Sequence, residues 1–372
     1  MHLAKLKLLH FKNYNLANFD FSKQVNCIFG ANGAGKTNIL DAIYYLSLTK
    51  SYFNSQDHQN IKHDNAFFSI DGTFVKDRIE ETVKVLVQVG KKKSIQTNNN
   101  EYQKLSEHIG QIPITIITPN DIYLINEGSE ERRKFLDAFI SQFDKNYLNN
   151  ILVYNRILDQ RNKMLKDFSE NRFFDSNLID SYNQVLCNSG KIILETRTAF
   201  LKSFIRIFKQ YYKTISCSNE EVDIEYVTNI DRGIAFIENF IQSEQEDLRA
   251  MRTSKGIHKD DLIFTIDGLP IKKYGSQGQQ KSFIIALKLA QFEYLKNHNS
   301  YIPLLLLDDI FEKIDEQRLD TLLNMISNKN FGQIFITDTH EDRLRNVFKT
   351  MTHVDVSFFE IKKGDYIPRL DT

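Results

Sequence analysis

Gly30-Ala31-Asn32-Gly33-Ala34-Gly35-Lys36-Thr37 is the stretch that decides the fold. It fits the phosphate-loop pattern G-x-x-x-x-G-K-[ST], follows an apolar strand at 25–29 and opens an amphipathic helix at 38–48. Its glycines let the backbone wrap around phosphate oxygens, so that consecutive N–H groups and the positive end of the helix point at the anion. We therefore expect a nucleoside triphosphate site, with Lys36 at the β- and γ-phosphates and the Thr37 hydroxyl on Mg²⁺.

Composition bounds what else the chain can do. With 372 residues, of which 41% are hydrophobic, it can form two lobes, and its zero net charge means that a polyanion must meet a local basic face. Cys27, Cys187 and Cys217 show no C-x-x-C spacing, which argues against a zinc site and a disulfide framework and favours a reducing cytoplasm. No run approaches the roughly 18 apolar residues of a membrane span, so we expect no membrane partner.

The chain changes texture twice along its length. The first 120 residues read as short strands broken by turns, whereas residues 129–216 have a helical period with Phe135, Phe139 and Phe143 on one face. Strands return at 262–266, 304–307 and 334–337. We expect the N- and C-terminal segments to share one sheet, because a phosphate loop needs an acidic partner on a neighbouring strand.

That partner is the run Pro303-Leu304-Leu305-Leu306-Leu307-Asp308-Asp309. A continuous apolar run ending in carboxylates is typical of a parallel strand that is buried on both faces and delivers its C-terminal end to a ligand crevice. We expect Asp308 to hold Mg²⁺ and Asp309 to orient or deprotonate the water that attacks the γ-phosphate. The alternative is a strand end capped by two solvated aspartates.

The type of ATPase is indicated by Tyr274-Gly275-Ser276-Gln277-Gly278-Gln279-Gln280-Lys281, followed by a helix at 282–295. This stretch resembles the signature motif of ABC-type ATPases in the S-Q-G-Q-Q variant of the RecF family of bacterial recombinational repair proteins. The resemblance implies that Ser276, Gln277 and Gly278 contact ATP on another protomer, so that two heads close as an ATP-dependent, head-to-tail homodimer.

Further segments extend the resemblance over nearly the whole chain. They are Phe11-Lys12-Asn13-Tyr14 (family F-R-N-Y), residues 113–128 (a P-x-D segment), 132–137 (R-R-x-F-L-D), 256–261 (G-P-H-R-D-D) and 312–315 (a D-loop, with Asp315 for communication across the dimer). Lys12, Ile257, Lys259 and Glu312 depart from the family pattern, and a lysine supplies no planar bidentate fork. Thr339 is the candidate γ-phosphate sensor, with His340 as a neighbour or a surface residue.

The resemblance also implies a fold and a function. The fold is α/β: an ABC-type P-loop ATPase head with a mixed central sheet, its halves at 1–112 and 251–372, and a mainly helical arm inserted at 113–250. The function is DNA replication and repair by a weak, DNA-stimulated ATPase. ATP-bound dimers would bind duplex DNA near single-strand gaps and act with RecR and RecO to load RecA in recombinational repair and the SOS response.

A basic stripe is the candidate DNA contact. Lys202, Arg206, Lys209 and Lys213 are spaced four, three and four apart on one face of a helix, opposite Leu201, Phe204, Ile205, Phe208 and Tyr212. Such a stripe suits phosphate contacts that position a duplex without reading its sequence, and the alternative is a solvated helix face. Lys91-Lys92-Lys93, at an expected hairpin tip, is a second candidate with the same alternative.

Two other functions share the ATP motifs. The nucleotide-binding subunit of an ABC transporter would carry an L-S-G-G-Q signature, where this chain has Gly275-Ser276-Gln277-Gly278-Gln279 and a large helical insertion. An ATPase-linked nuclease would need a further acidic cluster after the head. Neither requirement is met by the sequence.

Overall fold

The computed structural model describes residues 1–171, 175–216, 218–310, 321, 325, 331–349, 354–362 and 364–367. Contacts within the chain divide it into two units, the first made of 1–121, 214–217 and 281–372 and the second of 122–213 and 218–280. The scheme expected from the sequence assigned residues 251–280 to the head and 113–121 to the arm, whereas contacts group 251–280 with the second unit and 113–121 with the first. The segment around the signature is therefore built on the same unit as the long helices.

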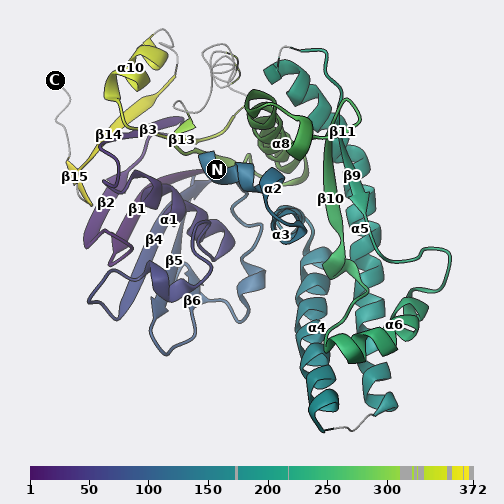
Figure 1. The fold of residues 1–372 in the computed structure, drawn as a ribbon. Coiled ribbons are helices and arrows are strands. Elements are labelled where there is room, and N and C mark those ends of the chain that lie inside the picture. Colours follow the sequence, from purple (N-terminus) through teal and green to yellow (C-terminus); the bar gives the residue numbers. More distant parts are fainter. Residues whose placement is uncertain are drawn as a thin grey trace. The chain divides into compact units, whose positions relative to one another are not determined.

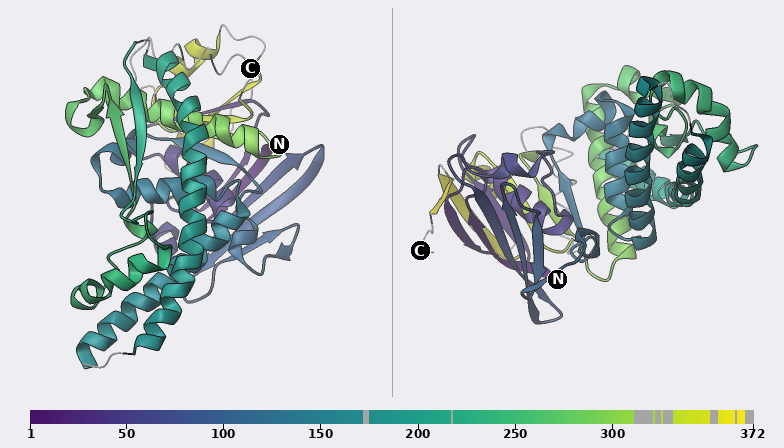
Figure 2. Two further views of the ribbon diagram at one scale, coloured as in Figure 1. Left: turned by 90° about the vertical axis from the view of Figure 1, so that its right-hand side faces the viewer. Right: turned by 90° about the horizontal axis from the view of Figure 1, so that it is seen from below.

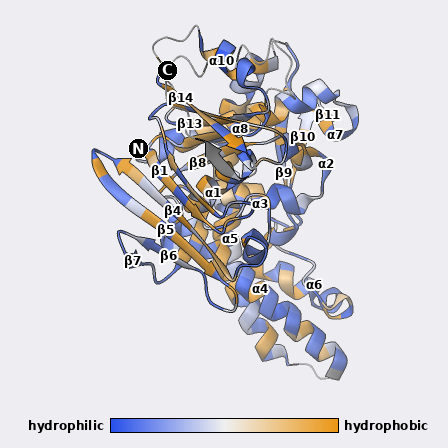
Figure 3. Ribbon diagram, turned by 90° about the vertical axis from the view of Figure 1, so that its left-hand side faces the viewer, coloured by the Kyte–Doolittle hydropathy of each residue, from blue (hydrophilic) through white to orange (hydrophobic). Residues whose placement is uncertain are grey.

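The first unit contains an antiparallel sheet with the strand order β2-β1-β4-β5-β6-β7 (Figure 1). Its strands are β1 (His2–Leu9), β2 (Leu16–Asp20), β4 (Phe67–Lys76), β5 (Ile79–Gln88), β6 (Ser94–Thr97) and β7 (Asn100–Glu101). Along β5, Val83, Val85 and Val87 are buried and alternate with more exposed residues, the period of two of a strand with one buried face. Figure 3, coloured by hydropathy, shows hydrophobic and hydrophilic residues mixed along the strands of this sheet. One face of this sheet is therefore buried in the core of the unit.

The second sheet of this unit, with the order β15-β14-β3-β13-β12-β8, carries the phosphate loop. Its strands are β3 (Val25–Phe29), β8 (Ile114–Ile117), β12 (Leu304–Leu307), β13 (Ile334–Asp338), β14 (Val356–Lys362) and β15 (Asp365–Ile367). All neighbours are parallel except β14 and β15, which pair antiparallel. The expected mixed sheet shared by both ends of the chain is confirmed, although β8, β14 and β15 were not anticipated from the sequence.

The core of the first unit lies between its two sheets. Helix α1 (Lys36–Leu48) contacts β4 and β5 of one sheet and β8 and β13 of the other. In the same unit, the Phe21 ring packs edge-on against Phe335 and Phe359, with centroids 4.8 and 5.2 Å away. The buried Gln333 amide accepts the N–H of Leu3 and donates to its carbonyl, joining β1 to the segment before β13. Helices α8 (Gln277–His298) and α10 (Glu341–Lys349) complete the described helices of this unit, α8 beginning in the second unit.

The second unit is the mainly helical arm. Its helices are α2 (Tyr123–Asn126), α3 (Ser129–Ile140), α4 (Lys145–Asn171), α5 (Ser176–Ser216), α6 (Phe236–Ala250) and α7 (Ile271–Tyr274). A three-stranded antiparallel sheet, β11-β10-β9, accompanies them, with β9 at Val222–Val227, β10 at Asp261–Ile266 and β11 at Leu269–Pro270. Helix α5 runs unbroken along the unit, as the left view of Figure 2 shows. Short 3₁₀ turns at Asp57–Asn60, Leu105–Glu107, Pro119–Ile122 and Ile257–Lys259 connect the other elements of the chain.

Charged contacts join α3 and α5 to the segment at 257–261 in the second unit. The guanidinium of Arg197 on α5, 1% exposed, lies 2.7 Å from the Asp137 carboxylate and 3.1 Å from that of Asp260. Arg132 makes two bonds to the Asp261 carboxylate, at 2.6 and 2.9 Å. The segments at 132–137 and 256–261, which the sequence singled out without a role, are thus tied to each other through complementary charges.

Candidate functional site

The phosphate loop follows β3, and its glycines have backbone dihedral angles that most other residues rarely adopt. Gly30, Gly33 and Gly35 have φ of 151, 75 and 118°. At Gly35, which caps α1, a Cβ would lie 2.6 Å from the Asn13 side-chain nitrogen, so both conformation and space call for glycine there. Helix α1 begins at Lys36, and its first N–H groups face the loop, as the strand-loop-helix pattern predicted.

Lys36 is held inside this loop. Its side chain is almost fully buried, and its Nζ donates to the carbonyls of Gly30 at 2.8 Å and Ala31 at 3.3 Å. A buried ammonium bonded only to carbonyl dipoles keeps its full positive charge available to an anion. The loop therefore offers one positive side chain and a set of backbone N–H groups to a phosphate.

The loop and the acidic strand meet at one hydrogen bond. The Thr37 hydroxyl donates to the Asp308 carboxylate, 2.9 Å from Oδ1 and 3.2 Å from Oδ2. This contact joins residues 271 positions apart, because β12 and β3 both flank β13 and end at the same edge of the sheet. The structure thus brings together the two residues that the sequence assigned to Mg²⁺.

Thr337 is a member of this cluster that the sequence analysis missed. Its buried hydroxyl donates to Asp308 Oδ1 at 2.8 Å and accepts the backbone N–H of Asp309 at 2.9 Å. No pattern in the sequence pointed to this role, because it depends on the register of β13, which places Thr337 one step beyond Ile336, the partner of Leu307. Thr339, the candidate sensor, makes a longer contact of 3.4 Å to Asp338, and His340 donates its backbone N–H to the same carboxylate.

Burial makes Asp308 an unusual carboxyl group. Its side chain is 5% exposed, and burial raises its pKa from 3.8 to about 6. The Thr337 hydroxyl opposes this rise, the charge of Asp309 adds to it, and Thr37 and Lys36 oppose it. A buried carboxylate that is costly to ionise alone is a site that gains free energy from a nearby cation.

The oxygen donors around Asp308 fit a hard divalent cation. One carboxylate and the hydroxyls of Thr37 and Thr337 converge there, and Mg²⁺ prefers a few oxygen ligands together with water and phosphate oxygens. The described residues contain no group of three or more His, Cys, Asp or Glu side chains arranged to hold a metal ion. Asp309 follows with φ of 41°, a left-handed conformation that is strained for a non-glycine residue.

The signature segment forms the start of α8 in the second unit. Ser276 and Gln279 cap each other: the Gln279 N–H donates to Ser276 Oγ at 3.2 Å, and Gln279 Oε1 accepts the Ser276 N–H at 2.6 Å. Ser276 and Gln277 are exposed, so a hydroxyl at a helix N-terminus faces outward. Asp315, the D-loop candidate, lies outside the described residues.

The basic stripe on α5 has the two faces that the sequence predicted. All four cations, Lys202, Arg206, Lys209 and Lys213, are exposed. On the opposite face Leu201, Phe204, Phe208 and Tyr212 are buried and Ile205 is half-buried. Lys209 is paired with Asp223 of β9 at 2.8 Å, with both side chains about half exposed. A surface ion pair of this kind is weak enough to exchange for a phosphate.

The second basic candidate is smaller than expected. Lys93 folds back onto the first unit, donating to the Asp57 carboxylate at 2.7 Å and the Thr49 carbonyl at 2.6 Å. Only Lys91 and Lys92 of that run are exposed. This hairpin therefore presents two exposed lysines, whereas the sequence pattern predicted three.

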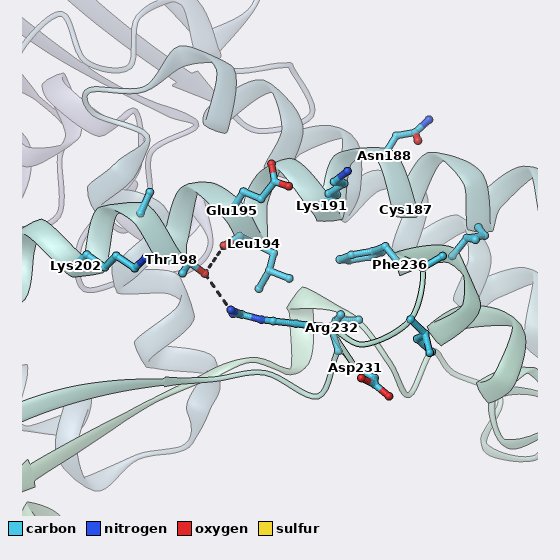
Figure 4. Close-up of a pocket in the computed structure, with 15 residues that line it drawn as sticks. Cys187, Asn188, Lys191, Leu194, Glu195, Thr198, Lys202, Asp231, Arg232 and Phe236 are labelled. Carbon is cyan, nitrogen blue, oxygen red and sulfur yellow. Dashed lines mark hydrogen bonds between the residues drawn. The ribbon is translucent and has the colours of Figure 1, made fainter.

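A groove of about 710 Å³ lies beside the stripe in the second unit, between α5 and residues 230–237 (Figure 4). Its wall combines apolar side chains such as Leu194 and Phe236 with charges of both signs. Arg232 reaches across it toward Thr198, whose hydroxyl accepts a bond of 3.3 Å. Lys202 belongs to both the groove and the stripe.

Comparison with known sequences gives consistent results. The family model described as RecF/RecN/SMC N terminal domain matches residues 2–360. The DNA replication and repair protein RecF of Flavobacterium johnsoniae is 47% identical over 365 residues, covering 97% of this chain and 100% of that protein. The protein of the same name from Cytophaga hutchinsonii is 43% identical over 364 residues, covering 98% and 96%.

Two solved structures resemble the chain, one closely and one in its fold alone. The recombination mediator protein RecF with ATP, from the RecFOR pathway, superposes with a TM-score of 0.88 at 29% identity, over 99% of this chain and 98% of that chain. The Smc head domain of Pyrococcus furiosus superposes with a TM-score of 0.56 at 17% identity, over 98% and 95%, a likeness of fold alone. Among the described helices of this chain, none combines the length and the apolar character that a membrane span requires.

Proposed function

The chain belongs to the RecF family, and on that premise we propose that it is an ATP-dependent DNA-binding switch of bacterial recombinational repair. Its relatives are DNA replication and repair proteins, and the family is one of ABC-type ATPases. In this chain, separate groups of residues bind ATP with Mg²⁺, form the homodimer interface and bind DNA.

The Thr37–Asp308 hydrogen bond is the observation that carries the ATP site. This bond joins the hydroxyl of the phosphate loop to the carboxylate of the acidic strand, and a cation bound there would touch both. Bound Mg²⁺ would neutralise phosphate charge in such a site. Lys36 and the loop N–H groups bind the β- and γ-phosphates, and Asp309 orients the attacking water and accepts its proton.

The exposed signature supports a composite site made by two protomers. Ser276 is already fixed as a helix cap, so its hydroxyl and the first N–H groups of α8 form a pre-organised set of hydrogen-bond donors for a phosphate. The ATP in one protomer would be covered by Ser276, Gln277 and Gly278 of the other. Thr339 would sense its γ-phosphate, and Asp315 would serve communication across the dimer. ATP then favours the dimer by binding across the interface, and slow hydrolysis releases it.

DNA is the proposed partner of the arm. The stripe of Lys202, Arg206, Lys209 and Lys213 offers exposed cations on one helix face, which suits phosphates without base recognition. We place the protein on duplex DNA beside single-strand gaps, in the cytoplasm where the chromosome lies, with hydrolysis stimulated by DNA. RecR and RecO are the expected partners in loading RecA, in line with the RecFOR pathway of the solved relative.

Neither rival function is favoured. A transporter subunit or an ATPase-linked nuclease would share the head alone, whereas the likeness to RecF proteins spans 97% or more of this chain, including the arm. The signature also keeps its S-Q-G-Q-Q form in residues 276–280.

Sedimentation velocity with Mg-ATP, with and without gapped DNA, tests the switch. We expect the wild-type mass to double with ATP and to return to the monomer as ATP is consumed, while Asp309→Asn stays dimeric on DNA. Ser276→Arg should abolish dimerisation, and Ser300→Arg, at an exposed serine away from the signature, should not. A mass that ATP leaves unchanged in wild type and Asp309→Asn alike would refute the switch.

A further inference from the structure

The segment Phe11-Lys12-Asn13-Tyr14 lies against the back of the phosphate loop. The Asn13 amide Nδ2 donates to the Ala34 carbonyl at 2.9 Å, and its Oδ1 accepts a bond of 2.7 Å from the side chain of Asn38 on α1. The buried Tyr14 hydroxyl donates to the Gly35 carbonyl at 3.1 Å. Two consecutive carbonyls of the loop are therefore bonded by side chains from outside it.

The C-terminal hairpin reaches the same carbonyl from another direction. In the turn between β14 and β15, the N–H of Gly364 also donates to the Ala34 carbonyl, at 2.9 Å. The fit is close, because Gly364 has φ of 81° and a Cβ there would lie 2.7 Å from the Asn13 carbonyl oxygen. At the start of the loop, a Cβ on Gly30 would lie 2.3 Å from the carbonyl oxygen of Ile361 on β14.

Carbonyl orientation decides whether such a loop attracts or repels an anion. A peptide unit whose N–H points into the loop has its C=O pointing out, and a rotation that reversed it would aim a partial negative charge at the phosphates. The Gly30 and Ala31 carbonyls are fixed by Lys36 from within. Ala34 precedes Gly35, which has no Cβ and a φ of 118°, so the peptide unit between them is restrained by a side chain on the Ala34 side only.

We propose that Asn13 and the Gly364 turn are positioning elements of the ATP site, which hold the Ala34 carbonyl outward and so keep the loop N–H groups aimed at the triphosphate. The two donors saturate the two lone pairs of one oxygen. Asn13 also ties Ala34 to α1 through Asn38, so the loop and the helix N-terminus keep one geometry. The C-terminal hairpin, on this reading, acts on nucleotide affinity without touching nucleotide.

The proposal rests on the ATP site proposed above, and one set of measurements separates the two. The affinity of the wild-type protein for a fluorescent ATP analogue with Mg²⁺ tests the site itself. Asn13→Ala, Gly364→Ala and the double variant then test the positioning role, together with KM and kcat for hydrolysis and the melting temperature without nucleotide. Failure of the wild type to bind would count against the site and not against the role of Asn13.

Each single variant should raise Kd and KM about threefold to tenfold, the range of one lost hydrogen bond, with kcat changed by less than about twofold. The double variant should lose less affinity than the product of the two single losses, since both act on one oxygen. Gly90→Ala, with a similar φ of 74° but nothing within 4 Å, and Asn18→Ala, at an exposed position on β2, are matched controls that should keep wild-type Kd.

Two results would overturn the proposal. One is a lower melting temperature in Asn13→Ala with Kd unchanged, which is the behaviour of a residue that only stabilises the fold. The other is a double variant whose loss equals the product of the single losses, since independent effects exclude a shared carbonyl. Should Gly364→Ala fail to fold, the Kd of Asn13→Ala against that of Asn18→Ala decides the question alone.

Discussion

Asp308→Asn should make the nucleotide-free protein more stable at neutral pH. The substitution keeps the shape of the side chain and an oxygen that can accept bonds from Thr37 and Thr337, but it removes the ionisable group. In the wild type, the Asp308 carboxyl group is 5% exposed and has a pKa of about 6 in place of 3.8. Folding therefore favours the protonated form of this group.

The pH dependence follows from that raised pKa. The stabilisation from the bound proton is complete below pH 3.8 and is lost as pH rises through about 6, where the folded protein must hold a buried carboxylate. A rise of about two pKa units means that ionised Asp308 lowers the free energy of unfolding by about 3 kcal/mol at pH 8, compared with the protonated form. At pH 5, where the group is partly protonated, this loss is about half as large. The Asn variant, which never ionises, should gain this difference over the wild type.

Urea unfolding at pH 5 and pH 8, in EDTA and without nucleotide, measures the effect. The free-energy advantage of Asp308→Asn should grow by about 1.5 kcal/mol between the two pH values. Asp20→Asn is the control, because that side chain is 81% exposed and should show no such growth. An Asp308→Asn variant that is less stable than the wild type at pH 8, or an advantage independent of pH, would show that ionisation of Asp308 is not costly.

Three further predictions concern other contacts. Thr337→Val leaves the Asp309 N–H without its hydroxyl partner and should cost about 1–3 kcal/mol of unfolding free energy, against little change in Thr339→Val, measured by urea titration. Arg197→Met removes the charge partner of the buried Asp260 and the half-buried Asp137 and should cost about 3–5 kcal/mol in the same assay, whereas Arg206→Met on the exposed face should cost under 1 kcal/mol. Lys202→Gln with Arg206→Gln should lower the slope of log affinity for duplex DNA against log salt by about 0.9 per lost phosphate contact, and an unchanged slope would exclude the stripe from the DNA interface.

Local patterns predicted the elements that carry the site. The phosphate loop is recognisable because its glycines, lysine and hydroxyl are contiguous, and the run of four leucines before Asp308 is too apolar for anything but a buried element. Their meeting could be inferred as well, since a loop that binds Mg-ATP needs an acidic strand nearby. The sheet confirms that inference by placing β3, β13 and β12 side by side.

Contacts set by strand register and distant charges could not be predicted in this way. Thr337 lies on Asp308 only because β13 pairs with β12 in one particular register. Arg197 looks like an ordinary polar residue on an amphipathic helix, and its partners Asp137 and Asp260 are about 60 residues away in each direction. The sequence pattern grouped Lys93 with its neighbours as surface charge, although its ammonium is bonded to the Asp57 carboxylate and the Thr49 carbonyl.

The strand order of the sheet with the phosphate loop has a consequence for biosynthesis. In the described part of the chain, β3 pairs only with β13 and β14, both from the C-terminal end. A ribosome that has made β3 must add about 300 more residues before either partner exists, which takes about 15–60 seconds at bacterial rates. During that time β3, an all-buried strand in the finished sheet, has both edges open and is exposed to misassociation. We expect the nascent chain to depend on chaperones over this interval, and the ATP site to appear only after the last strands leave the ribosome.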